Sequence, residues 1–246
     1  MISLIIKTVS AALRKACGNI PFAAMRAIPS RRGGLGSSFS MRALFPLMLL
    51  LPSLLLSSCA LLSPGPPPTR LKLTPSMPAR VAGGPLNKQI IVGMPLAGQD
   101  VDTDNIALVF NNREVRYLSG VRWTSSVPPI VQRALIDALT ASNGLRGVSD
   151  ESAGIFADAK LLSDIRQFAL RYDDPKGVPT AVATINFSVL NLSDGSILGT
   201  KNISIEVPAA GRDNVALVTA CETALSRCLA DVTPWVIQTI GAKRKR

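Results

Sequence analysis

The chain has 246 residues, of which 47% are hydrophobic and 17% charged. It contains no histidine, and this excludes a His-based catalytic triad, a His-ligated metal site and a His general base. Its formal net charge of +11 comes from its ends, because residues 1–58 hold seven basic and no acidic residues and the last four residues are all basic. The stretch between is close to neutral, so the sequence does not indicate the basic face that nucleic-acid binding requires.

A mostly apolar run at residues 43–56 follows a single positive charge, Arg42, and ends in Leu-Ser-Ser-Cys59. The order of charged, apolar and small residues is typical of a secretory signal. The run is shorter than the roughly 20 apolar residues of a transmembrane helix. Its end resembles the lipobox of a bacterial lipoprotein precursor. That resemblance implies cleavage before Cys59, a diacylglyceryl group on the Cys59 sulfur and usually a further acyl chain such as palmitate. An ordinary cleaved signal or a buried helix with an incidental cysteine are the alternatives.

The chain divides into five predicted parts around this signal. Met41 is the favoured initiator, because the residues before it supply no required part of a signal. Ala60, directly after the lipidated cysteine, indicates the outer membrane by analogy with enterobacterial lipoproteins, the inner membrane being the alternative. The parts are a non-native or disordered extension at 1–40, the signal peptide at 41–58, a Pro-rich tether at 59–68, a folded domain at 69–240 and a basic tail at 241–246. The tail could touch anionic lipid or stay solvated.

Runs of β-branched and aromatic residues separated by turn residues predict a strand-rich domain. Residues 105–110 and 114–118 flank Asn111-Asn112 as a hairpin, and Asp194-Gly195 closes a second one. Residues 76–87 form a Pro/Gly-rich loop. The predicted strands are 69–73, 89–94, 105–110, 114–118, 145–149, 161–172, 180–191 and 196–207.

Residues 127–142 show apolar residues at helical spacing instead. Ser125 or Ser126 is expected to cap the start of this helix, and Asn143-Gly144 to end it.

A second helix is predicted from about Asp213, a favourable N-cap, to about Ile240, with a kink at Pro234. Cys221 and Cys228 share one face of it, about 10.5 Å apart by the helical rise, which is too far for a disulfide between them. We expect both to be small buried apolar residues. The whole pattern predicts a single α+β domain with a mostly antiparallel sheet and two main helices on one face.

No catalytic constellation, metal site or cofactor motif is visible, and none is predicted. Asp100, Asp102 and Asp104 alternate as in a calcium loop, but the Gly and Glu of an EF-hand do not follow, which favours a solvated turn. Glycine-rich phosphate loops are also absent.

Tyr117, Arg122 and Trp123 lie close together just before the first helix, in a chain with only two Tyr and two Trp. Aromatic and arginine side chains are enriched in protein interfaces, so these three are the candidate partner interface. The alternative is that Trp123 packs under the helix as a core residue.

The order of these features resembles the ABC-type transport auxiliary lipoproteins, the family that includes the PqiC-like lipoproteins. The lipobox, the Pro-rich spacer and the Asp102–Ala107 turn carry the resemblance, together with Tyr117, Arg122-Trp123 and the helix that ends at Trp235. Thr69 stands where an aromatic residue is common in that family.

The resemblance implies a non-catalytic lipoprotein that faces the periplasm and works beside an ABC permease, its ATPase and an MCE-domain substrate-binding protein. Such systems move lipids or other hydrophobic compounds between membranes. An envelope-assembly or structural lipoprotein without a transporter is the alternative, and an anchored hydrolase is disfavoured by the lack of histidine. Whether the chain is a homo-oligomer stays open.

Overall fold

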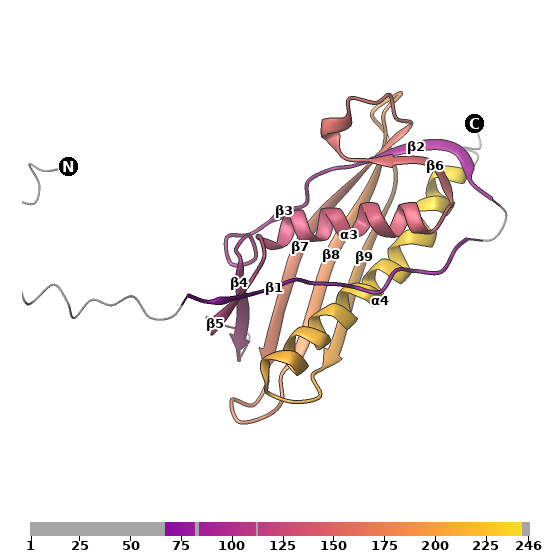
Figure 1. Cartoon of the computed structure of the whole chain (residues 1–246). Coiled ribbons are helices and arrows are strands. Elements are labelled where there is room, and N and C mark those ends of the chain that lie inside the picture. The colour runs from indigo at the N-terminus through magenta and orange to yellow at the C-terminus, as the bar shows by residue number, and fades with distance from the viewer. Residues whose placement is uncertain (1–66, 82–83, 112, 243–246) are drawn as a thin grey trace, which may run out of the picture. The chain divides into compact units, whose positions relative to one another are not determined.

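The longest strand, β7 (Ala159–Tyr172), is the centre of a nine-stranded sheet in the computed structural model of the chain (Figure 1). One edge of β7 pairs with β8 (Thr180–Asn191), and β8 pairs in turn with β9 (Ile197–Pro208). The other edge of β7 meets three shorter strands one after another. They are β2 (Leu86–Val92), β3 (Leu96–Ala97) and β4 (Asn105–Phe110). The last three strands are β6 (Leu145–Ser149) beside β2, β5 (Glu114–Trp123) beside β4 and β1 (Thr69–Leu71) beside β5.

The structure describes residues 67–81, 84–111 and 113–242. The predictions about the extension, the signal peptide, Cys59, most of the tether and the four terminal basic residues therefore lie outside the described residues.

The sheet is mixed in direction. Three long antiparallel pairings, β7 with β8, β8 with β9 and β4 with β5, include most of the paired residues. The five parallel pairings are short, from two to four residue pairs each. The α+β class with two helices is confirmed.

Both helices cover the same face of the sheet (Figure 1). The 28-residue helix α4 (Asn214–Gly241) lies over β7, β8 and β9, while α3 (Val127–Ala141) lies over β2 and β6 and contacts α4. The core lies between the helices and the sheet. Its largest fully buried side chains include Trp123, Phe187, Ile90, Leu135 and Leu225.

The two helices begin with different caps. The Asp213 carboxylate accepts hydrogen bonds from the backbone N–H groups of Val215 and Ala216, at 3.1 and 3.0 Å, which confirms it as the N-cap of α4. Ser126 is the N-cap residue of α3, but its side chain makes no capping bond. Two prolines in the first turn of α3 remove N–H donors that would otherwise need a partner. Asn143, at φ 52°, ends α3 in the left-handed conformation, as expected from the Asn-Gly pair.

An extended segment, residues 72–81, follows β1, runs beside α3 and crosses the outer side of α4 (Figure 1). Both the backbone N–H and the hydroxyl of Thr74 donate to Glu222 Oε1, each at 2.8 Å. The Val81 N–H then donates to the Ser142 carbonyl at the end of α3, at 2.9 Å. The segment thus connects α4 to the end of α3 through polar contacts.

Strand β5 extends further than the sequence pattern predicts. Its first half pairs with β4, but the register shifts by several residues between Tyr117 and Arg122, with Gly120 at φ 76°. Beyond this irregularity the strand continues to Trp123 beside β1. The predicted strand 114–118 is therefore the first part of a longer strand that has a bulge at Gly120.

Candidate functional site

Trp123 lies in the core and is 1% exposed. Its ring centre is 6.4 Å from that of Phe168, in a tilted aromatic pair. The prediction that Trp123 belongs to a partner interface is therefore corrected. The core alternative is the one the structure shows, because the end of β5 places this indole in the core against Phe168 of β7.

Tyr117 and Arg122 remain on the surface, but the bulge in β5 separates them. The Tyr117 side chain is 45% exposed. Arg122 lies 3.6 Å from the Asp104 carboxylate, which is also 3.4 Å from Arg70. Asp104 thus neutralises two arginines, which gives this member of the acidic loop a structural role. Within the described residues no group of three or more Cys, Asp or Glu side chains is placed to hold a metal ion.

A gap in the sheet lies beside the middle of β7. Strand β3 pairs with Asp164 and Ile165, and β4 begins to pair only at Leu170. Among the described residues no strand pairs with this edge of β7 between those points. Opposite the gap the register with β8 shifts, because Arg166 is an extra, bulged residue. Bulges of this kind occur often next to functional sites, where they re-aim side chains.

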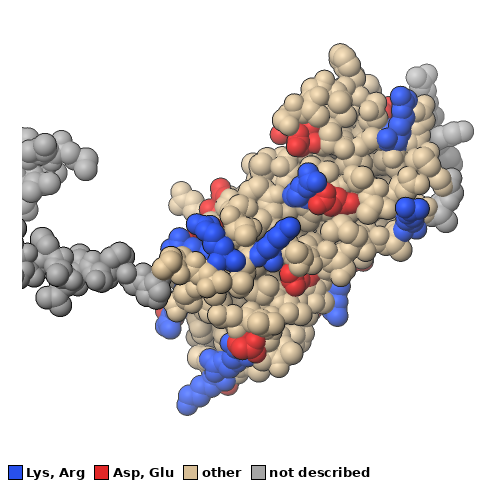
Figure 2. Space-filling view, viewed as in Figure 1, with Lys and Arg blue, Asp and Glu red and all other residues tan. Residues whose placement is uncertain are grey.

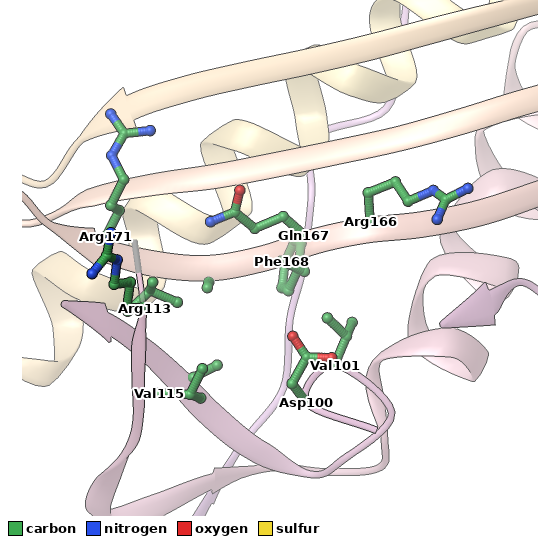
Figure 3. Close-up of a pocket in the computed structure, with 11 residues that line it drawn as sticks. Asp100, Val101, Arg113, Val115, Arg166, Gln167, Phe168 and Arg171 are labelled. Atoms are coloured by element: carbon green, nitrogen blue, oxygen red, sulfur yellow. The ribbon is translucent and has the colours of Figure 1, made fainter. Parts of the chain in front are cut away.

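The gap contains a cavity of about 450 Å³ (Figure 3). By strand alternation Gln167 and Ala169 point away from the face that the helices cover, since Phe168 and Leu170 point into the core. We call this cavity the sheet cavity. The apolar residues on the cavity side, here called its floor, are Val101, Ala107, Val109, Val115 and Ala169, and its rim consists of Asp100, Arg113, Arg166, Gln167 and Arg171. Phe168 also lines the cavity, but its ring packs against Trp123 in the core.

Arg171 is held in place on the rim. Its guanidinium donates to both carboxylate oxygens of Glu206, at 2.7 and 2.8 Å, and to Asp173 at 3.1 Å. These bonds raise the pKa of Arg171, and the bonds from Arg171 lower the pKa of Glu206. Arg166 lies 2.8 Å from Asp164.

Arg113 and Asp100 differ from the other charged rim residues, because neither forms an ion pair with any of the described residues. Figure 3 draws Arg113 and Arg171 at one end of the cavity, Arg166 at the other end and Asp100 between them. Arg113 and Asp100 are thus the two rim charges without an ion pair among the described residues, whereas Arg166 and Arg171 are each paired with carboxylates.

Tyr117 lies on the same face of the sheet as this cavity, although it is not one of its lining residues. It lies directly across from Ala107 in the pairing of β4 with β5, and residues opposite each other in antiparallel strands share a face. None of the three residues that the sequence singles out, Tyr117, Arg122 and Trp123, is a lining residue of the sheet cavity. The cavity itself was missed, because its lining comes from three distant segments. A charged residue beside a hairpin turn, Arg113, was the only local signal.

The face that carries the helices has a second cavity, of about 510 Å³, between the segment after β1 and α3, and its lining includes Met77, Ile130, Arg133 and Asp137. Basic and acidic side chains are interspersed there, without an area of a single sign (Figure 2). The two cysteines of α4, Cys221 and Cys228, are free and buried, as expected. Burial raises the pKa of each thiol to about 12, so neither is a reactive thiolate near neutral pH.

Comparison with known proteins assigns this fold. A family model described as "ABC-type transport auxiliary lipoprotein component" matches residues 71–233. A crystal structure of a Xanthomonas campestris protein of the DUF330 family is 22% identical, with a TM-score of 0.65, covering 70% of this chain and 95% of that one. A crystal structure titled only as an uncharacterized protein is 12% identical, with a TM-score of 0.52, covering 65% and 99%. No curated protein matches the sequence.

The two crystal structures show that the fold is shared. The family match runs from the end of β1 into the last turns of α4. The chain therefore belongs to the family of ABC-type transport auxiliary lipoprotein components.

Proposed function

We propose that the chain is the non-catalytic auxiliary subunit of an ABC transport system that moves lipids or other hydrophobic compounds between membranes. The observation that carries the proposal is the family match over residues 71–233, which spans nearly the whole described domain. In this proposal the partners are the permease, its ATPase and an MCE-domain substrate-binding protein. The domain contributes binding surfaces, and ATP hydrolysis belongs to the ATPase.

Membrane attachment in this proposal depends on Cys59. Within the described residues no helix is long and apolar enough to cross a membrane. A lipidated Cys59 would hold the domain at the bilayer, and the ten residues 59–68, if extended as polyproline, would reach about 31 Å. Ala60 supports attachment to the outer membrane, with the domain facing the periplasm.

The partner surface in this proposal includes Tyr117 and Arg122, the two members of the predicted interface that are exposed. Tyr117 offers an amphipathic ring, and Arg122 keeps 43% of its side chain exposed while it pairs with Asp104. Both lie on β5, on either side of the Gly120 bulge, so one partner surface could contact both.

Affinity capture from detergent-solubilised envelopes tests the proposal. We expect the tagged full chain to enrich a permease, an ATPase or an MCE-domain protein, as identified by mass spectrometry. Enrichment of envelope-assembly proteins alone would support the alternative of a structural lipoprotein. The double change Tyr117→Ala with Arg122→Gln should reduce the captured partner. Arg227→Gln, which removes an exposed arginine of α4, is the matched control.

A further inference from the structure

We propose that the sheet cavity binds a single apolar chain that ends in an anionic group, as in a fatty acid or a single-chain phospholipid. The inference depends on the chemistry of the cavity and not on the identity of the transport partners.

The floor favours an apolar chain. Its five residues carry only hydrocarbon side chains; Val101, Ala107 and Ala169 are already buried, and Val115 keeps 41% of its surface exposed. Tyr117, 45% exposed, adds an aromatic ring on the same face of the sheet. Covering this surface with a hydrocarbon chain would remove it from water, which is favourable in proportion to the apolar area buried.

The size of the cavity favours one chain. Its volume of about 450 Å³ lies in the lower half of the range of about 300–1,000 Å³ that small-molecule pockets span. The gap in the sheet also bounds the space along β7, since β3 ends on one side and β4 begins on the other.

The charges on the rim favour an anionic end group and orient it. Arg113 has no ion-pair partner among the described residues, so its guanidinium is available to a ligand. Arg171 beside it uses three of its five N–H donors on Glu206 and Asp173, which fixes its orientation and leaves two donors. Asp100, which lies away from these two arginines, would repel an anion, and Arg166 at the other end is already paired with Asp164. The anionic group would therefore lie at the Arg113 end.

Photochemical labelling of the full chain in nonionic detergent tests this inference. The first probe is hexadecanoic acid with a diazirine in its chain, and the second is the matching uncharged alcohol, which enters the micelles in the same way. We expect the acid to label the strands around the sheet cavity, β4, β5 and β7, as mapped by mass spectrometry. Unlabelled hexadecanoate or lysophosphatidylglycerol should compete, and which one competes better identifies the source of the anionic group.

Arg113→Gln should weaken concentration-dependent labelling by the acid at least about tenfold, the size expected for one lost charge-assisted hydrogen bond. Labelling by the alcohol should not change, and Arg227→Gln should behave as the wild type. Circular dichroism would show that each variant is folded. Labelling spread over the surface, equal labelling of the wild type and Arg113→Gln, or no competition by either lipid would each overturn the inference. A failed partner capture with intact cavity labelling would count against the proposed function alone.

Discussion

Single residues of this domain take roles that their type alone does not determine. Trp123 and Tyr117 are both aromatic residues of β5, yet one is 1% and the other 45% exposed. Both side chains are amphipathic and they are close in sequence, so neither property tells which of the two is buried. The bulge at Gly120 does, because it changes the alternation of the strand between them. Sequence reasoning could therefore propose both residues but could not separate core from surface.

Replacement of these two aromatic residues should have unequal effects on stability. Trp123→Ala removes a fully buried indole and should lower the free energy of unfolding by about 3–5 kcal/mol. Tyr117→Ala, in the same strand, should change it by no more than about 0.5 kcal/mol. Urea unfolding measures both. Equal, small effects would contradict the burial of Trp123.

Asp158 should make stability depend on pH. Its carboxylate accepts hydrogen bonds from Lys88 Nζ at 2.7 Å and from the Gln89 N–H at 2.9 Å, and these bonds lower the pKa of Asp158. A lowered pKa in the folded state gives stability that is present above the unfolded pKa of about 3.9 and is lost as the pH falls through the folded pKa.

Asp158→Asn should therefore cost about 1 kcal/mol near pH 7, a value reduced for solvent screening of this partly exposed carboxylate. The difference from the wild type should shrink as the pH is lowered through the folded pKa, as followed by urea unfolding at a series of pH values. A difference that stays constant with pH would contradict the assigned role of the carboxylate.

At the scale of elements, the local chemistry of turns and caps was sufficient for most boundaries. The Asp-Gly pair closes the hairpin of β8 and β9, and Asp213 begins α4 as predicted. The two-residue strand β3, and the pairing of β2 and β3 with one edge of β7, were not predictable, because short parallel pairings depend on segments that are distant in sequence. Serine before a helix was also an ambiguous signal, since Ser126 stands at the N-cap position without a side-chain bond.

The two caps make a matched pair of variants. Asp213→Ala removes two side-chain hydrogen bonds to the first turn of α4 and should cost about 1 kcal/mol. Ser126→Ala removes no capping bond from α3 and should cost far less. Thermal unfolding of both variants gives the comparison. A larger loss from the serine than from the aspartate would show that the caps are assigned wrongly.

At the scale of the whole molecule, the domain combines a helix-covered face with a face that bears the sheet cavity. If Cys59 carries the lipid, the domain's access to partners depends on that anchor.

Cys59→Ser should abolish incorporation of an alkyne fatty acid and leave an uncleaved or soluble species, because buried acyl chains contribute about 0.8 kcal/mol per CH₂ to membrane binding. Equal labelling of the wild type and Cys59→Ser would remove the anchor from the account.

The most direct test of the transport assignment is chemical cross-linking in intact cells, followed by mass spectrometry of the purified chain. It reports neighbours before detergent can separate them. We predict cross-links from lysines of the domain, such as Lys72 and Lys88, to a permease, ATPase or MCE-domain subunit. Cross-links only to envelope-assembly or structural proteins would contradict the account.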